Sequence, residues 1–70
     1  MIIAKSKTHN MLIVLEKVNN TFFIKRIVGN KQKFLFDSND LSKLITELIR
    51  IIPQPILTEL ILQLIKSENL

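Results

Sequence analysis

The chain has 70 residues, a formal net charge of +4, no cysteine and a hydrophobic content of 47%. This length allows one domain with a small core, and the lack of cysteine excludes disulfides and thiolate metal sites that could reinforce it. Such an apolar composition is high for so small a domain. It predicts that the protein associates with a partner, most simply with a second copy of itself.

Neither a secretory signal nor a membrane span is predicted. The first four residues are followed at once by Lys5 and Lys7, which leaves no room for an apolar signal core. The apolar region 41–66 carries five charged residues, and its longest uncharged run, Ile51–Thr58, has eight residues. A bilayer span needs about 20. We therefore expect a cytoplasmic protein with no membrane span.

The first half of the chain is typical of an antiparallel β-meander. Its two turns, Asn19-Asn20 and Gly29-Asn30, consist of residues that tolerate the positive φ of type I′ and II′ hairpins. Ile2–Lys5 would add one more strand at an edge, so three or four strands are expected. The segments rich in β-branched and aromatic residues are Met11–Val18, Thr21–Val28 and Lys31–Phe36.

A helical hairpin is predicted over residues 38–67. The polar residues from Asp37 to Asp40 can cap a helix start, and Pro53 and Pro55 break the helical pattern between two apolar stripes. The chain thus predicts one α+β domain over residues 1–70, with two amphipathic helices packed on one sheet face. The stripes are Leu41, Leu44, Ile45, Leu48, Ile49 and Ile52, then Leu57, Leu60, Ile61, Leu64 and Ile65.

Two-residue turns fix the strand register, so the two sheet faces can be assigned. One face would carry Phe23, Phe34 and Phe36 with balanced charge, and we expect the helices to cover it. The other face has four cations and no anion, and Arg26 would lie directly opposite Lys33. Like charges in that position destabilise a pair, which suggests an anion between them.

The basic face predicts nucleic-acid binding, possibly to single strands. Residues 1–36 hold seven cations and one anion, whereas residues 37–70 hold three cations and five anions. Cations would follow phosphates and an aromatic ring would stack on a base. The alternative is a solvated lysine face whose apolar members are covered by another subunit or by the N-terminal segment. The candidate residues are Lys17, Phe22, Arg26, Lys31 and Lys33.

Three apolar residues fall outside the two helical stripes, namely Ile51, Ile56 and Leu62. They are the predicted contact between subunits of a homodimer or higher oligomer. They also support an alternative function, in which the protein is an adaptor or inhibitor that docks on another protein through its apolar helical hairpin.

No catalytic, cofactor or metal motif is present, so we expect a binding protein rather than an enzyme. The chain has no phosphate-binding loop, no zinc-ligand spacing and no paired acid and base. His9 is the one histidine. Its neighbours Thr8 and Asn10 favour an exposed turn over a catalytic role.

Overall fold

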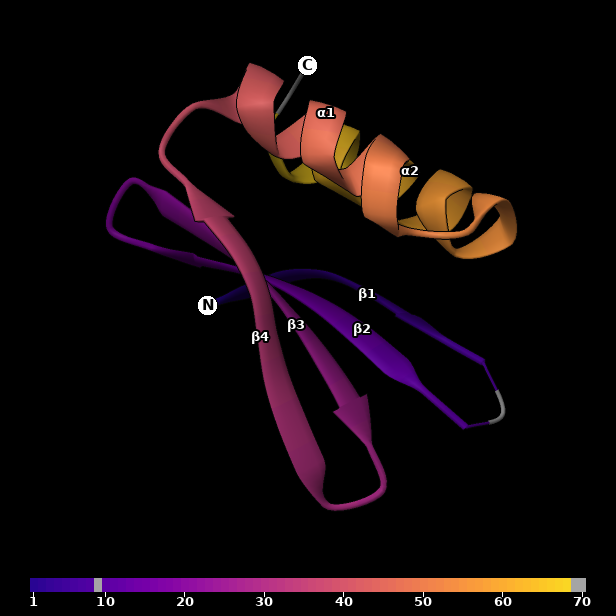
Figure 1. Ribbon diagram of the computed structural model, residues 1–70. Coiled ribbons are helices and arrows are strands. Elements are labelled where there is room, and N and C mark those ends of the chain that lie inside the picture. The colour runs from indigo at the N-terminus through magenta and orange to yellow at the C-terminus, as the bar shows by residue number, and fades with distance from the viewer. Residues whose placement is uncertain (9, 69–70) are drawn as a thin grey trace.

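The computed structural model describes residues 1–8 and 10–68 of the chain. Four antiparallel strands form one open sheet in the order β1-β2-β3-β4, and two helices then cover one face of it (Figure 1). The predicted α+β fold is confirmed. The elements are β1 Ile2–Lys7, β2 Leu12–Val18, β3 Thr21–Val28, β4 Lys31–Ser38, α1 Leu41–Ile51 and α2 Gln54–Glu68.

Both predicted hairpin turns form. Asn19 has φ 52° and Gly29 has φ 60°, the left-handed conformation that asparagine and glycine adopt at least cost. A Cβ on Gly29 would meet no atom within 4 Å, so conformation rather than space favours glycine there. The turns set the predicted pairing, with Val18 opposite Thr21 and Arg26 opposite Lys33.

The helices cover the sheet face opposite to the predicted one. Phe22 is only 4% exposed, and it joins the leucines of both helices in a single apolar cluster. We call this covered side of the sheet the core face and the other side the open face. The buried strand residues of the core face are Ala4, Ile13, Leu15, Phe22 and Ile24, packed with Leu44, Leu48, Leu60 and Leu64.

The error in the face prediction has a physical cause. The total charge of a face does not show where its charges lie, and the cations of the core face lie only near its ends, at Lys17 and from Arg26 onward. Apart from the buried Ser6 on β1, the centre of that face is apolar. Two short helices need only this centre, so the cations at the margins stay clear of the core.

A β-bulge interrupts β4. Ile24 pairs with Phe36 and Lys25 pairs with Phe34, so Leu35 is an extra residue without a direct partner. Leu35 and Phe36 both pack against the core, whereas Phe34 lies on the open face. The prediction that Phe34 and Phe36 share a face is therefore wrong, because a bulge shifts the alternation of side chains by one residue.

The helical hairpin forms as predicted, with differences in its buried stripe. The Asp40 carboxylate caps α1 by accepting a hydrogen bond of 2.9 Å from the Ser42 amide. Ile56, predicted to lie at a subunit contact, is 5% exposed and belongs to the core. Ile49 and Ile65, predicted inside the stripes, are exposed instead.

Both edges of the sheet are guarded against further strands. At β1, the side-chain amide of Gln63 accepts a hydrogen bond from the Lys5 N–H (2.9 Å) and donates one to the Lys5 carbonyl (2.8 Å). At β4, Lys31, Lys33 and the bulge oppose pairing, because charges and irregular backbone disfavour strand addition.

Candidate nucleic-acid interface

Two of the five predicted nucleic-acid contacts are engaged inside the protein. Phe22 is buried between sheet and helices, so its predicted role in stacking on a base is incompatible with its position. The Lys17 ammonium lies 5.1 Å from the centre of the Phe22 ring and 2.8 Å from a carboxylate oxygen of Glu68. Lys17 therefore helps to hold the end of α2 on the sheet.

The other three predicted cations do come together. Arg26 and Lys33 are directly opposite on β3 and β4, and Lys31 pairs with Val28 at the tip of the same hairpin. Together with Val28 and Gln32 they line a surface hollow of about 470 Å³. We call Arg26, Lys31 and Lys33 the hairpin cluster.

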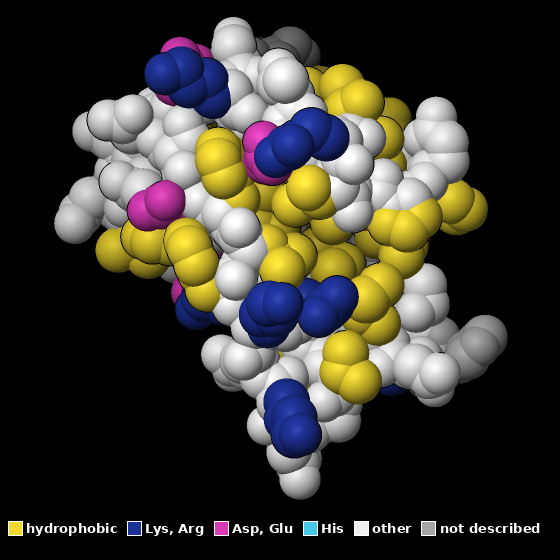
Figure 2. Space-filling view, in the orientation of Figure 1, with side chains coloured by type: hydrophobic (Ala, Val, Ile, Leu, Met, Phe, Trp, Pro, Cys, Tyr) yellow, Lys and Arg dark blue, Asp and Glu magenta, His cyan; other side chains and the backbone are white. Residues whose placement is uncertain are grey.

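The hairpin cluster is accessible because of how the helices are placed. The β3–β4 hairpin projects past the helical layer (Figure 1), so neither α1 nor α2 extends over the core side of its tip. Figure 2 shows Lys and Arg side chains gathered over this projecting part of the sheet, below a largely apolar region beside the helices. Lys31 and Lys33 are exposed and Arg26 is half-buried.

The hairpin cluster has no internal counter-ion among the described residues. The three ion pairs found within residues 1–8 and 10–68 involve Lys17, Lys25 and Arg50, and none includes a member of the cluster. Repulsion between Arg26 and Lys33 is thus uncompensated. A bound anion would relieve it, and a phosphate matches the planar fork of the Arg26 guanidinium.

The open face has a different electrostatic character. The Lys25 ammonium lies 2.8 Å from a carboxylate oxygen of Glu16, and this hydrogen bond and the lysine charge lower the pKa of Glu16. Lys5 and Lys7 are exposed on β1. Val14 lies in register between Lys5 and Lys25 and is nevertheless buried, as expected if the lysine stems on both sides shield it.

Phe34 is a surface residue that the sequence interpretation missed, since it was expected under the helices. A local pattern in the sequence indicates which face the helices cover. The apolar pairs Ile13/Leu15 and Phe22/Ile24 occupy alternate positions at the middle of two neighbouring strands, and that is where a helix layer packs.

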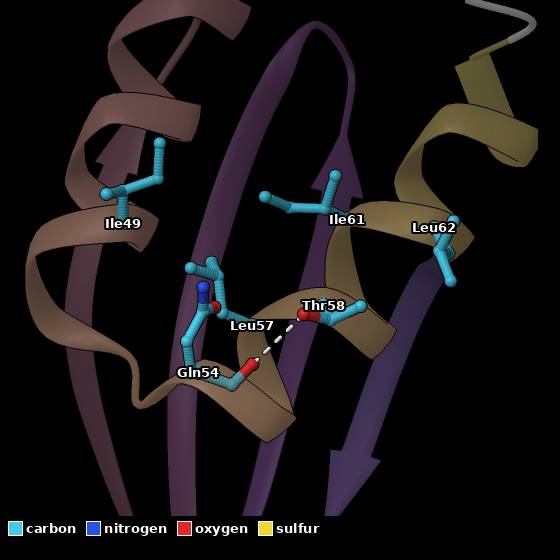
Figure 3. A pocket seen from close by; sticks show the side chains of 6 residues that line it. All are labelled: Ile49, Gln54, Leu57, Thr58, Ile61 and Leu62. Atoms are coloured by element: carbon cyan, nitrogen blue, oxygen red, sulfur yellow. Dashed lines mark hydrogen bonds between the residues drawn. The ribbon is translucent and has the colours of Figure 1, made fainter.

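A second surface feature is an apolar groove between the helices. It has a volume of about 360 Å³ (Figure 3). Of the three predicted subunit contacts, Leu62 lines this groove and is 57% exposed, Ile51 lies outside it with partial exposure, and Ile56 is buried. The lining residues are Ile49, Gln54, Leu57, Thr58, Ile61 and Leu62.

Other kinds of site find little support in the described part of the chain. Within residues 1–8 and 10–68, no three His, Cys, Asp or Glu side chains gather as a metal site would require. Neither described helix has the length and apolarity needed to cross a membrane. His9 lies outside the described residues.

No protein-family model matches the sequence, and no match was found to a curated protein or to a solved structure. Function is therefore inferred from the geometry of the chain alone.

Proposed function

We propose that the protein is a small non-enzymatic binding protein that holds nucleic acid on its hairpin cluster. One observation carries the proposal: Arg26 lies directly across from Lys33, next to Lys31, without an ion-pair partner among the described residues. Folding places these like charges together at a cost, and the phosphate backbone of a nucleic acid would offset it.

The chemistry of such an interface is mainly electrostatic. Each cation that neutralises a phosphate releases condensed counterions, so affinity falls as the salt concentration rises. The hollow between Arg26, Lys31 and Lys33 accommodates phosphate groups, while the apolar stems of these side chains can lie along sugars. We also propose a cytoplasmic location, where nucleic acid is accessible.

The test is a charge reversal with a matched control. Arg26→Glu combined with Lys33→Glu reverses two cations of the cluster. Lys43→Glu combined with Lys66→Glu changes the net charge equally, but on exposed positions of α1 and α2. Binding of labelled DNA and RNA oligonucleotides, single- and double-stranded, is followed by fluorescence anisotropy at several salt concentrations.

We expect the cluster variant to lose at least about tenfold in affinity and to show a shallower salt dependence, because about two phosphate contacts are removed. The helix variant should lose much less. Equal losses in both variants would mean that only net charge matters. Absence of binding by the unaltered protein, or unchanged binding by the cluster variant, would refute the proposal.

We further propose that the protein self-associates as a homodimer through the helical groove. Ile49 and Leu62 line the groove and are more than half exposed, so the same surface offers both an apolar hollow and accessible apolar side chains at its walls. A two-fold symmetric interface needs such self-complementarity. A second copy is thus the occupant favoured here, ahead of an unrelated protein docked by an adaptor or inhibitor.

The oligomeric state is measured by light scattering coupled to size-exclusion chromatography. Leu62→Glu should convert the dimer to a monomer, because a carboxylate would be buried in an apolar contact. Ser42→Glu adds the same charge at the N-terminal end of α1, outside the groove, and should leave the dimer intact. A monomeric unaltered protein at concentrations of about 100 μM would contradict self-association, since even a modest dimer of this kind is populated there.

A further inference from the structure

The open face carries an aromatic side chain that the core does not require. Phe34 is 53% exposed, whereas the other three phenylalanines are buried or half-buried. Its ring contacts Phe23 edge to face, with centroids 6.3 Å apart and an interplanar angle of 60°. The contact steadies Phe34 while more than half of its surface stays accessible. An aromatic ring held in this way suits stacking on a planar ligand group.

Phe34 is next to the hairpin cluster. Lys33 and Phe34 are consecutive on the edge strand β4, so their side chains point to opposite faces. Only the width of β4 separates the phosphate-binding side of the hairpin from its aromatic side. A flexible polyanion that follows this edge can reach both.

The charges along β4 define which part of the edge such a chain would use. Lys31 and Lys33 lie toward the tip of the hairpin, and Asp37 lies opposite Phe23 toward its root. A phosphate backbone is attracted to the tip and repelled from the root. Lys25, opposite Phe34, is engaged by Glu16. The path with the most favourable charge therefore passes around the tip half of β4.

We propose that the ligand is single-stranded nucleic acid, with phosphates on the hairpin cluster and one unpaired base stacked on Phe34. This inference rests on the proposed nucleic-acid function and adds the choice of single strands over duplex. Bases within a duplex are already stacked on their neighbours, so they offer no free face to Phe34. An unpaired base does, whatever its identity, so little sequence preference is expected.

A tryptophan at position 34 provides a direct readout. The chain contains no tryptophan or tyrosine, so Phe34→Trp introduces a single fluorophore while it keeps an aromatic ring in place. A thymine homopolymer of about 20 nucleotides should quench this fluorescence upon binding, because a stacked base contacts the indole directly. A duplex of the same length, bound through its phosphates, should leave it nearly unchanged.

Affinity measurements on Phe34→Ala complete the test. Loss of the ring should weaken single-strand binding by about tenfold and leave duplex binding unchanged. Val18→Ala shortens another exposed apolar side chain, at the far end of the sheet, and is the control. Circular dichroism checks that the variants fold.

The outcomes separate this inference from the proposed function. The single-strand inference is overturned if the unaltered protein binds single strands and duplex equally and Phe34→Ala binds both with unchanged affinity. In that case, a loss of affinity in the Arg26→Glu, Lys33→Glu variant still supports nucleic-acid binding. If no nucleic acid binds, both are overturned. If Phe34→Ala instead lowers the molecular mass in solution, the open face contacts a second copy and the inference is likewise overturned.

Discussion

The side-chain amide of Gln63 forms two hydrogen bonds with the backbone of Lys5, 58 residues earlier in the chain. It takes the place of a neighbouring strand, since it accepts from the N–H and donates to the C=O of the same residue. The pair fastens α2 to the outer edge of the sheet. It also occupies backbone groups that could otherwise pair with another chain.

Gln63→Ala is expected to lower the free energy of unfolding by about 1–2 kcal/mol, because two hydrogen bonds to the backbone are lost. Gln32→Ala, at an exposed position of β4, should change it by less than about 0.5 kcal/mol. Urea unfolding followed by circular dichroism measures both. Faster amide exchange at Lys5 would accompany the loss, and equal effects of the two substitutions would show that the contact adds no stability.

Phe22→Ala should destabilise the protein by about 3–5 kcal/mol, because it leaves a cavity between sheet and helices. Phe34→Ala should cost only about 1 kcal/mol, since its ring is largely exposed and loses mainly its contact with Phe23. Chemical denaturation of the two variants side by side measures the difference. The reverse order would mean that the helices cover the other face of the sheet.

The ion pair between Lys25 and Glu16 predicts a pH dependence of stability. The pKa of Glu16 in the folded protein is lowered from its ordinary value of 4.5, so the carboxylate contributes stability above that pH. This contribution is lost as the pH falls through the lowered pKa. Glu16→Gln should therefore be less stable than the unaltered protein at pH 7, and the difference should vanish once the pH lies below the lowered pKa.

Thermal unfolding across this pH range provides the measurement for Glu16→Gln. The same substitution in a Lys25→Met background is the control, since the partner that lowers the pKa is then absent. A stability difference that persists unchanged in that background, or at acid pH, would assign the effect to something other than this pair.

Asp40→Ala should destabilise the protein by about 1 kcal/mol, because the first turn of α1 loses the acceptor for the Ser42 amide. Asn39→Ala alters an adjacent exposed residue and should have a much smaller effect. Both are measured by urea unfolding. If Asn39→Ala proves the more costly, the residue that caps α1 is misassigned.

The local elements of this fold follow from the sequence because each depends on near neighbours. Asn19 and Gly29 adopt the positive φ that two-residue hairpins require, and the break between the helices falls at Pro53, with Pro55 in the first turn of α2. The edge strand β1 runs to Lys7, two residues past its predicted end. Its pairing with β2 and its contact with Gln63 supply the long-range support that the local pattern did not reveal.

The choice of sheet face and the bulge could not be obtained in the same way. Both faces are rich in apolar residues, so the covered face is indicated by where the apolar pairs lie along β2 and β3 and not by the overall composition of each face. Leu35 disrupts an alternation that otherwise looks regular, and no turn residue or glycine marks it. Ile56 was expected at the surface, yet it is buried because the inward stripe of α2 is rotated by about one position.

The bulge at Leu35 divides β4 into two halves, each with its own alternation of side chains between the two faces. On the helix side of the bulge, Leu35 and Phe36 are fixed by the core, and on the tip side the alternation starts afresh at Phe34. Residues between Arg26 and Phe34 can therefore be exchanged without changing which side chains of the buried half face the core. The same holds if the hairpin is lengthened by equal numbers of residues in β3 and β4. The ligand preference of the hairpin tip can in this way be redesigned by substitution, while the sheet and helices of the core keep their sequence.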